Sequence, residues 1–181
     1  MAYIGVAKPT IAKMEDTGNT YSAPVVCGKA IQIDITPQYA EGSLFGDNGK
    51  AEYDKEFKQA DIVLNTTSLP IAVHETMFGH TVEESSITFK DSDESNYVGF
   101  GFYVTEKVDG KKKYTATWLP KTKFSEGAES YKTKGDNIEY QTPSVTGQAL
   151  ALDNGIWKEV EQFDTEAEAQ QFINEKISPS S

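Results

Sequence analysis

The chain has 181 residues, of which 38% are hydrophobic and 25% charged, and its 28 acidic residues outnumber 17 basic ones to give a net charge of −11. This balance predicts one folded domain rather than a disordered chain. All 17 basic residues are Lys, and the absence of Arg argues against a nucleotide enzyme and a DNA reader, because both classes rely on guanidinium groups to bind phosphate or guanine. The negative charge also predicts that DNA would be repelled.

The sequence shows no apolar run of membrane-spanning length and no secretion signal, so we expect no contact with a membrane and folding in a reducing cytoplasm. The single Cys27 lies in an apolar run and has no cysteine partner. A buried, chemically inert thiol is therefore expected there.

Two strands are expected early in the chain. In Ala30–Thr36 the Ile residues alternate with polar ones, and Pro37 is expected to end this strand; Ala60–Thr67 is rich in β-branched residues. The polar stretch Gln38–Gln59 between them reads as a long loop. Loops of this length usually have a function.

The strongest local signal is a hairpin in which Tyr97–Val104 and Tyr114–Leu119 flank an Asp109-Gly110 turn. Close backbone approach is the expected reason for Gly99 and Gly101. Further strands are predicted at Asn137–Thr142, Val145–Leu152 and Ile156–Phe163. The fold class is therefore mainly β.

Two short helices complete the prediction. Ser68 is expected to cap a helix over Leu69–Phe78 that ends at Gly79, and Thr165 with Glu168 forms a capping box at the start of a C-terminal helix. We therefore expect a single domain over residues 1–181, with a core at about 4–163, the C-terminal helix at 164–177 and a frayed tail at 178–181.

The stretch GDNGKAEYDKEF, Gly46–Phe57, superficially resembles a calcium loop, but its Gly49 comes too early for that pattern and a turn is the better interpretation. A weak surface cation at this acidic stretch stays open. The Lys111–Lys113 run is expected to be a solvated hairpin tip.

His74 and His80 are the only imidazoles, and their spacing does not match the helical zinc-protease pattern. No nucleophile motif accompanies them. The sequence therefore predicts no catalytic residue, no cofactor and no metal ligand.

Several linked segments resemble the major tail proteins of phages that have long, non-contractile tails and infect Gram-positive bacteria. These segments are Ser43–Glu52, Met77–His80, Tyr97–Phe102, Trp118–Phe124 and Thr133–Pro143. The resemblance extends over Ile4–Trp157, and its specificity lies in the combination and order of the segments.

The resemblance implies a tail-tube β-sandwich or barrel with a flanking short helix, a long assembly loop and no enzymatic activity. Copies of the chain would form six-membered rings that stack into a virion tail, assembled in the host cytoplasm. The other implied partners are a tape measure protein, a tail terminator and DNA in transit through the lumen. The assembly loop corresponds to Gln38–Gln59, with Leu44, Phe45, Asp47, Tyr53 and Phe57 as its contact residues.

Two other classes remain open from the residues. A ligand-binding or carbohydrate-binding β-sandwich, assisted by calcium, would need an exposed aromatic platform built from Tyr97, Tyr103 and Trp118, although alternation favours core positions for several of these. A hydrolase built around His74 or His80 is the third reading.

Overall fold

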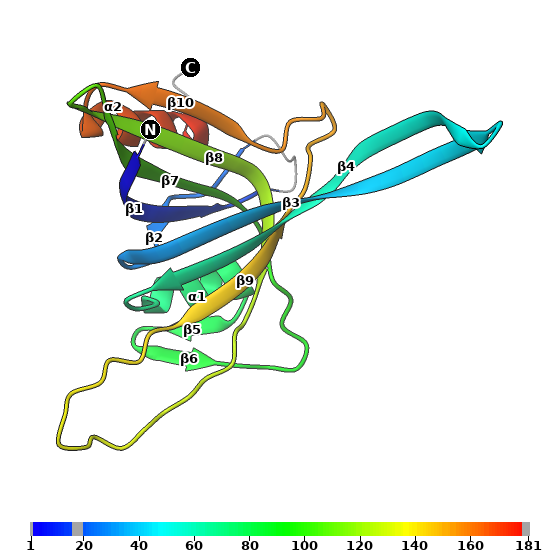
Figure 1. Cartoon of the computed structure of the whole chain (residues 1–181). Coiled ribbons are helices and arrows are strands. Elements are labelled where there is room, and N and C mark those ends of the chain that lie inside the picture. The colour runs from blue at the N-terminus through cyan, green and yellow to red at the C-terminus, as the bar shows by residue number, and fades with distance from the viewer. Residues whose placement is uncertain (1, 16–19, 179–181) are drawn as a thin grey trace.

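The computed structural model describes residues 2–15 and 20–178 (Figure 1). Over these residues the protein is mainly β, as predicted. Its elements are β1 (Ala2–Lys13), β2 (Val25–Val26), β3 (Ala30–Gly46), β4 (Gly49–Thr66), α1 (Ile71–Phe78), β5 (Thr81–Glu83), β6 (Ser86–Thr88), β7 (Tyr97–Val108), β8 (Lys111–Ser125), β9 (Ser144–Ala149), β10 (Glu159–Phe163) and α2 (Glu166–Ile177).

Eight strands form one antiparallel sheet in the order β2-β1-β7-β8-β9-β4-β3, with β10 also paired to β8, and β5 and β6 form a separate two-stranded sheet. One edge of β8 is shared, because Tyr114–Trp118 pair with β10 whereas Thr122–Ser125 pair with β9. The large sheet curves at this strand, so that β3, β4 and β9 lie across β1 and β7 (Figure 1).

The main core lies between the two parts of this curved sheet. Ile11 of β1, Phe100 of β7 and Phe124 of β8 pack there against Ile62 and Leu64 of β4, and all five side chains are almost completely buried. The helix α1 closes the same core with three further buried side chains, Val73, Met77 and Phe78. Removing this apolar surface from water is the main stabilising contribution expected for a domain without disulfides.

A second core lies on the other face of β7 and β8, where α2 covers the sheet (Figure 1). Trp118 and Tyr103 from the sheet pack there with Ile173 and Ile177 from α2. The two glycines of β7 permit this contact, since a Cβ at Gly99 would lie 2.3 Å from the Trp118 ring and a Cβ at Gly101 would lie 2.7 Å from Ile173. The close approach expected from the sequence is therefore present.

The predicted helix ends differ in accuracy. The capping box of α2 is present, with the Thr165 hydroxyl accepting from the Glu168 amide while the Glu168 carboxylate accepts from the Thr165 amide. The predicted cap of α1 is wrong, because this helix begins at Ile71 after Pro70 and has no side-chain cap at all. Gly79 ends α1 in the left-handed conformation, as predicted.

The predicted end of the first strand at Pro37 is also wrong. Proline lacks an N–H, but β3 is the last strand in the order of the sheet, so one of its edges has no strand neighbour within residues 2–15 and 20–178 that requires a donor. The strand therefore continues through Pro37, which pairs with Ala60, and on to Gly46.

The hairpin of β7 and β8 is confirmed, whereas several other predicted strands change. The segment Asn137–Thr142 is irregular and pairs with no strand among the described residues, and β10 begins only at Glu159. The long β1 and the short β2, β5 and β6 were missed. Residues 179–181 of the expected tail lie outside the described residues. Neither helix in the described ranges has the length and apolar character needed to cross a membrane.

Candidate functional site

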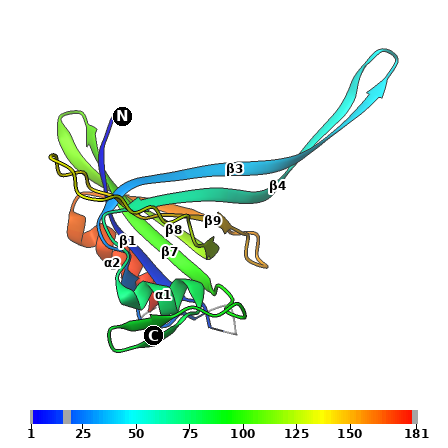
Figure 2. The ribbon, with the colours of Figure 1, turned by 90° about the horizontal axis from the view of Figure 1, so that it is seen from below.

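The stretch predicted as a loop, Gln38–Gln59, is the outer part of a long hairpin made by β3 and β4 (Figure 2). The two strands pair from Ala30 with Thr66 outward to Gly46 with Gly49. The expectation of a loop is therefore corrected: backbone pairing continues to the tip. We call residues 38–59 the arm.

The tip of the arm is a two-residue turn formed by Asp47 and Asn48. Their φ angles are 48° and 62°, so both residues lie in the left-handed region that this type of hairpin turn requires. The turn expected for this stretch is therefore present. Asp47 belongs to no cluster of three potential metal ligands among the described residues.

The arm has open strand edges. β9 pairs only with Ala60–Asn65 of β4, so the part of β4 inside the arm has β3 as its sole strand neighbour among the described residues. The outer edge of β3 has no strand neighbour in the same ranges. Unpaired N–H and C=O groups along such edges can bind another strand.

One face of the arm combines aromatic and charged side chains. Lys55 lies 4.2 Å from the centre of the Tyr39 ring and 3.8 Å from the Glu41 carboxylate, and Lys50 lies 3.7 Å from the centre of the Tyr53 ring. At the base of this face Phe57 stacks on Trp157, with ring centres 4.6 Å apart.

The opposite face is acidic. Strand alternation places Glu52, Asp54 and Glu56 together there, with Leu44 opposite Glu52. Near the tip Leu44 is 60% exposed and Phe45 is 72% exposed. Large apolar side chains at such exposure on a projecting ribbon are suited to burial against a partner.

The five residues predicted as loop contacts therefore occupy different positions. Leu44, Phe45, Asp47 and Tyr53 are exposed in the outer arm, whereas Phe57 is half-buried at the base, where it joins the arm to the domain. Tyr39 is a further exposed aromatic residue, on the face of the arm that carries Lys55, and it was not predicted. Period-two alternation across Pro37 would have indicated it.

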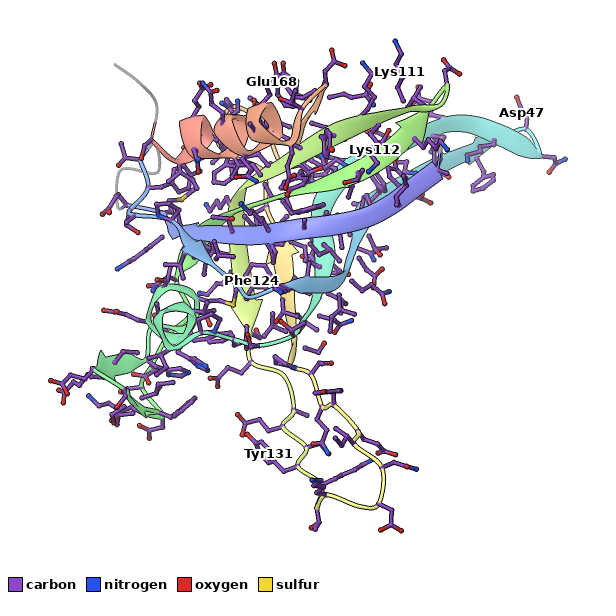
Figure 3. The ribbon with its side chains drawn as sticks, turned by 90° about the vertical axis from the view of Figure 1, so that its left-hand side faces the viewer. Asp47, Lys111, Lys112, Phe124, Tyr131 and Glu168 are labelled. Atoms are coloured by element: carbon purple, nitrogen blue, oxygen red, sulfur yellow. The ribbon has the colours of Figure 1, made fainter. Side chains whose placement is uncertain are left out.

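A second projection is the irregular segment of residues 126–143, which carries Tyr131 away from the core (Figure 3). Tyr131 and Tyr140 are 84% and 88% exposed. The segment borders a half-open cavity of about 730 Å³ next to α1.

The end of α1 brings the two histidines together with carboxylates from distant segments. His80 Nδ1 is 2.8 Å from an Asp93 oxygen, and His80 Nε2 is hydrogen-bonded to Glu126. His74, His80 and Glu126 each offer a ligand atom within 4.8 Å of the others. Spacing along a helix did not predict this cluster, because the left-handed Gly79 turns the chain back and the His80 amide donates to the His74 carbonyl.

The pKa values of the two imidazoles are shifted in opposite directions. Burial opposes protonation of His80, but the hydrogen bonds to Asp93 and Glu126 outweigh it and raise its pKa. Burial, reinforced by the neighbouring His80, lowers the pKa of His74. The Nδ1 atom of His74 is buried and has no hydrogen-bond partner in the part of the chain that the structure describes.

Neither imidazole is hydrogen-bonded to a Ser or Cys among the described residues, and Cys27 is completely buried, with its pKa raised by burial to about 12. The aromatic platform considered for a carbohydrate site does not form either. Trp118 and Tyr103 are buried under α2, and Tyr97 is left as the exposed member.

The Lys111–Lys113 run follows the predicted hairpin turn. Lys111 and Lys112 are exposed there, as expected for a solvated tip, and Lys113 forms an ion pair with Asp164 (Figure 3).

Neither a scan of protein-family models nor a search of curated proteins finds a match to this chain.

Proposed function

We propose that this protein is a structural subunit of a phage tail tube, the major tail protein of a long, non-contractile tail. The observation that carries the proposal is the arm: a hairpin that leaves the domain, exposes Leu44 and Phe45 near its tip and keeps open strand edges. A surface of this kind fits a protein that works by contacting copies of itself.

The geometry supports a head-to-tail contact. The arm is a thin ribbon with one acidic face and one aromatic face, and the rest of the domain presents no second ribbon like it among the described residues (Figures 1 and 2). In the proposed assembly the arm of one copy contacts the body of the next copy. Such a contact repeats without limit unless a ring closes it, which suits a stacked assembly.

The body of the domain supports the same role. Its curved sheet fits the sandwich or barrel implied by the family resemblance, and the outer edges of β3 and β10 are available for strand pairing within a ring. The net charge of −11 and the absence of Arg suit a lumen that DNA passes without binding. The family resemblance adds further parts to this proposal. These are six-membered rings, a tape measure protein and a tail terminator as partners, location in the virion tail, and assembly in the host cytoplasm.

Negative-stain electron microscopy of the purified chain, over a range of protein concentrations and with light scattering alongside, tests the proposal. Rings or tubes of uniform width are the expected result. A strict monomer at every concentration, up to the limit of solubility, would speak against self-assembly as an intrinsic property of the chain.

Shortening the arm gives a sharper test of its role. Deleting Leu44–Phe57 should leave a folded monomer that cannot stack, and a better-matched variant keeps the Tyr39–Phe57 pair and replaces residues 40–56 by an Asn-Gly turn. The better-matched variant keeps Phe57 and leaves both cores untouched, so its thermal midpoint should stay close to that of the parent while stacking is lost. The Leu44–Phe57 deletion also removes Phe57 from the base of the arm, so its midpoint should be lower. Assembly of the shortened variant into normal tubes would refute the role of the arm.

Point variants test whether the side chains at the tip contribute to stacking when the backbone of the arm is intact. Phe45→Ser should reduce stacking, and Phe89→Ser is its control, because Phe89 is another exposed Phe that lies outside the arm. Equal loss of stacking in both variants would mean that replacing any exposed Phe by Ser has this effect, and that Phe45 has no specific role.

A further inference from the structure

We propose that His74, His80 and Glu126 form a binding site for a transition-metal dication of the Zn²⁺ class. The three side chains come from separate places in the chain: α1, the residue after the Gly79 turn and the start of the 126–143 segment. The fold nevertheless holds one potential ligand atom of each within 4.8 Å of the other two.

The chemistry of the donors selects the metal class. Two imidazole nitrogens and one carboxylate are a ligand set that Zn²⁺ accepts, with a fourth position open for water or another group. Ca²⁺ and Mg²⁺ prefer oxygen-only sites with more ligands. A nitrogen-rich set of three therefore favours Zn²⁺ or Co²⁺ over those ions.

The supporting contacts orient one of the ligands. Asp93 accepts a hydrogen bond from the Lys90 amide at 2.8 Å and lies 2.8 Å from His80 Nδ1. With Nδ1 held in this way, His80 presents Nε2 towards Glu126. A carboxylate behind a metal-binding histidine is the usual arrangement that fixes the ring and increases its basicity.

The presence of His74 beside the His80 ion pairs favours a metal site over a simple ion pair. Asp93 and Glu126 already account for His80, so a purely structural cluster would need no second imidazole. His74 lies beside this cluster with ring contacts to Phe78 and Phe89, and its Nδ1 is buried without a hydrogen-bond partner among the described residues. A buried imidazole that lacks a hydrogen bond is unfavourable, and in the proposed site the ring gains a metal ion as its partner.

The site also has an entry route and a structural consequence. The cavity next to α1 is lined by both His74 and Glu126, so an ion could reach the cluster from solvent. A bound ion would tie the start of the irregular 126–143 segment to the end of α1, and zinc sites of this kind add directly to folding stability.

Isothermal titration of the full chain, produced without a polyhistidine tag and stripped with a chelator, tests the proposal with ZnCl₂ as the ligand. The expected result is one Zn²⁺ per chain. His74→Leu should weaken binding by at least about a hundredfold, and Asp93→Asn, which removes only the supporting contact, should weaken it by about 10–100-fold. Glu75→Gln is the control, because Glu75 is exposed, adjacent to His74 and outside the cluster.

His74→Leu is the central variant because it should fold. It removes no hydrogen bond of His74 Nδ1, so its metal-free thermal midpoint should equal or exceed that of the parent. Zinc should raise the midpoint of the parent and slow protease cleavage within residues 127–143, and should do neither for the variant. Equal zinc affinity in parent and His74→Leu, or no one-to-one binding in the parent, would overturn the proposal.

Discussion

Gly99 shows how a single residue makes room for an aromatic ring on the face of the sheet that α2 covers. A Cβ at this position would overlap the ring of Trp118, which is itself fully packed between β8 and α2. The sequence indicated that something approaches closely at Gly99 and Gly101, because glycine in a strand interior is otherwise unfavourable. It could not indicate Trp118, which lies on another strand and is brought there by the register of β7 and β8.

The substitution Gly99→Ala should therefore destabilise the fold by roughly 1–3 kcal/mol, the usual cost of overpacking a core. The measurement is the midpoint of urea unfolding. Gly5→Ala is the control, since a Cβ there meets no atom within 4 Å and the change should be neutral or slightly stabilising. Equal midpoints for the two variants would show that Trp118 moves aside at little cost.

The two helices show which elements local sequence can predict. The start of α2 follows from a contact between residues three apart, Thr165 and Glu168, and it was predicted correctly. The start of α1 is set by Pro70, which takes the N-cap position, so that Ser68 lies outside the helix and does not cap it. The capping box is a contact between side chain and backbone that the sequence spacing specifies, whereas the residue at which α1 begins depends on the backbone path that leads out of β4.

The helix α2 should also make stability sensitive to alkaline pH. The Tyr103 hydroxyl of β7 donates to Glu166 in the first turn of α2, and burial, this hydrogen bond and the nearby Tyr114 together raise the pKa of Tyr103 from 10 to about 12. The folded state thus keeps this proton longer than the unfolded state. Its contribution to stability is complete below pH 10 and is lost as the pH rises towards 12.

Urea unfolding of parent and Tyr103→Phe between about pH 9 and pH 12 measures this contribution. The parent should lose stability more steeply than the variant over that interval. Some loss should remain in the variant, because the pKa values of Tyr21 and Cys27 are raised to about 12 as well. Parallel curves would mean that Tyr103 ionises without affecting the docking of α2.

At the scale of the molecule, the mainly β fold class and the hairpin of β7 and β8 could be predicted from the sequence, whereas the pairing of strands far apart in the chain could not. Alternation and an Asp-Gly turn were enough for β7 and β8, because their pairing is local. The pairing of β1 with β7 joins residues some ninety positions apart, and no local pattern encodes it. The cluster of His74, His80 and Glu126 was missed for the same reason, since only the tertiary fold brings Glu126 to the histidines.

The charge of the whole chain leads to a prediction that depends on the proposed function. Copies that each carry −11 repel one another, and salt screens this repulsion, with a Debye length of about 30 Å at 0.01 M and about 8 Å at 0.15 M ionic strength. The protein concentration at which rings or tubes first appear should therefore fall several-fold across this range. Light scattering at the two salt concentrations measures it, with sucrose of equal osmolality as the control. Weaker association at the higher salt would instead indicate contacts dominated by pairs of opposite charge.

The length of the arm separates the residues at its tip, which are exposed for contact, from the residues of the two cores, which stabilise the fold. A strand advances about 3.3 Å per residue, so the nine residues from Gln38 to Gly46 carry the tip roughly 30 Å from the base of the arm. Changes so far apart act almost independently on free energy. Selection can therefore alter Leu44, Phe45 or Asp47 to suit a new contact while the two cores stay as they are, and mutations that weaken the cores leave the contact chemistry at the tip unchanged.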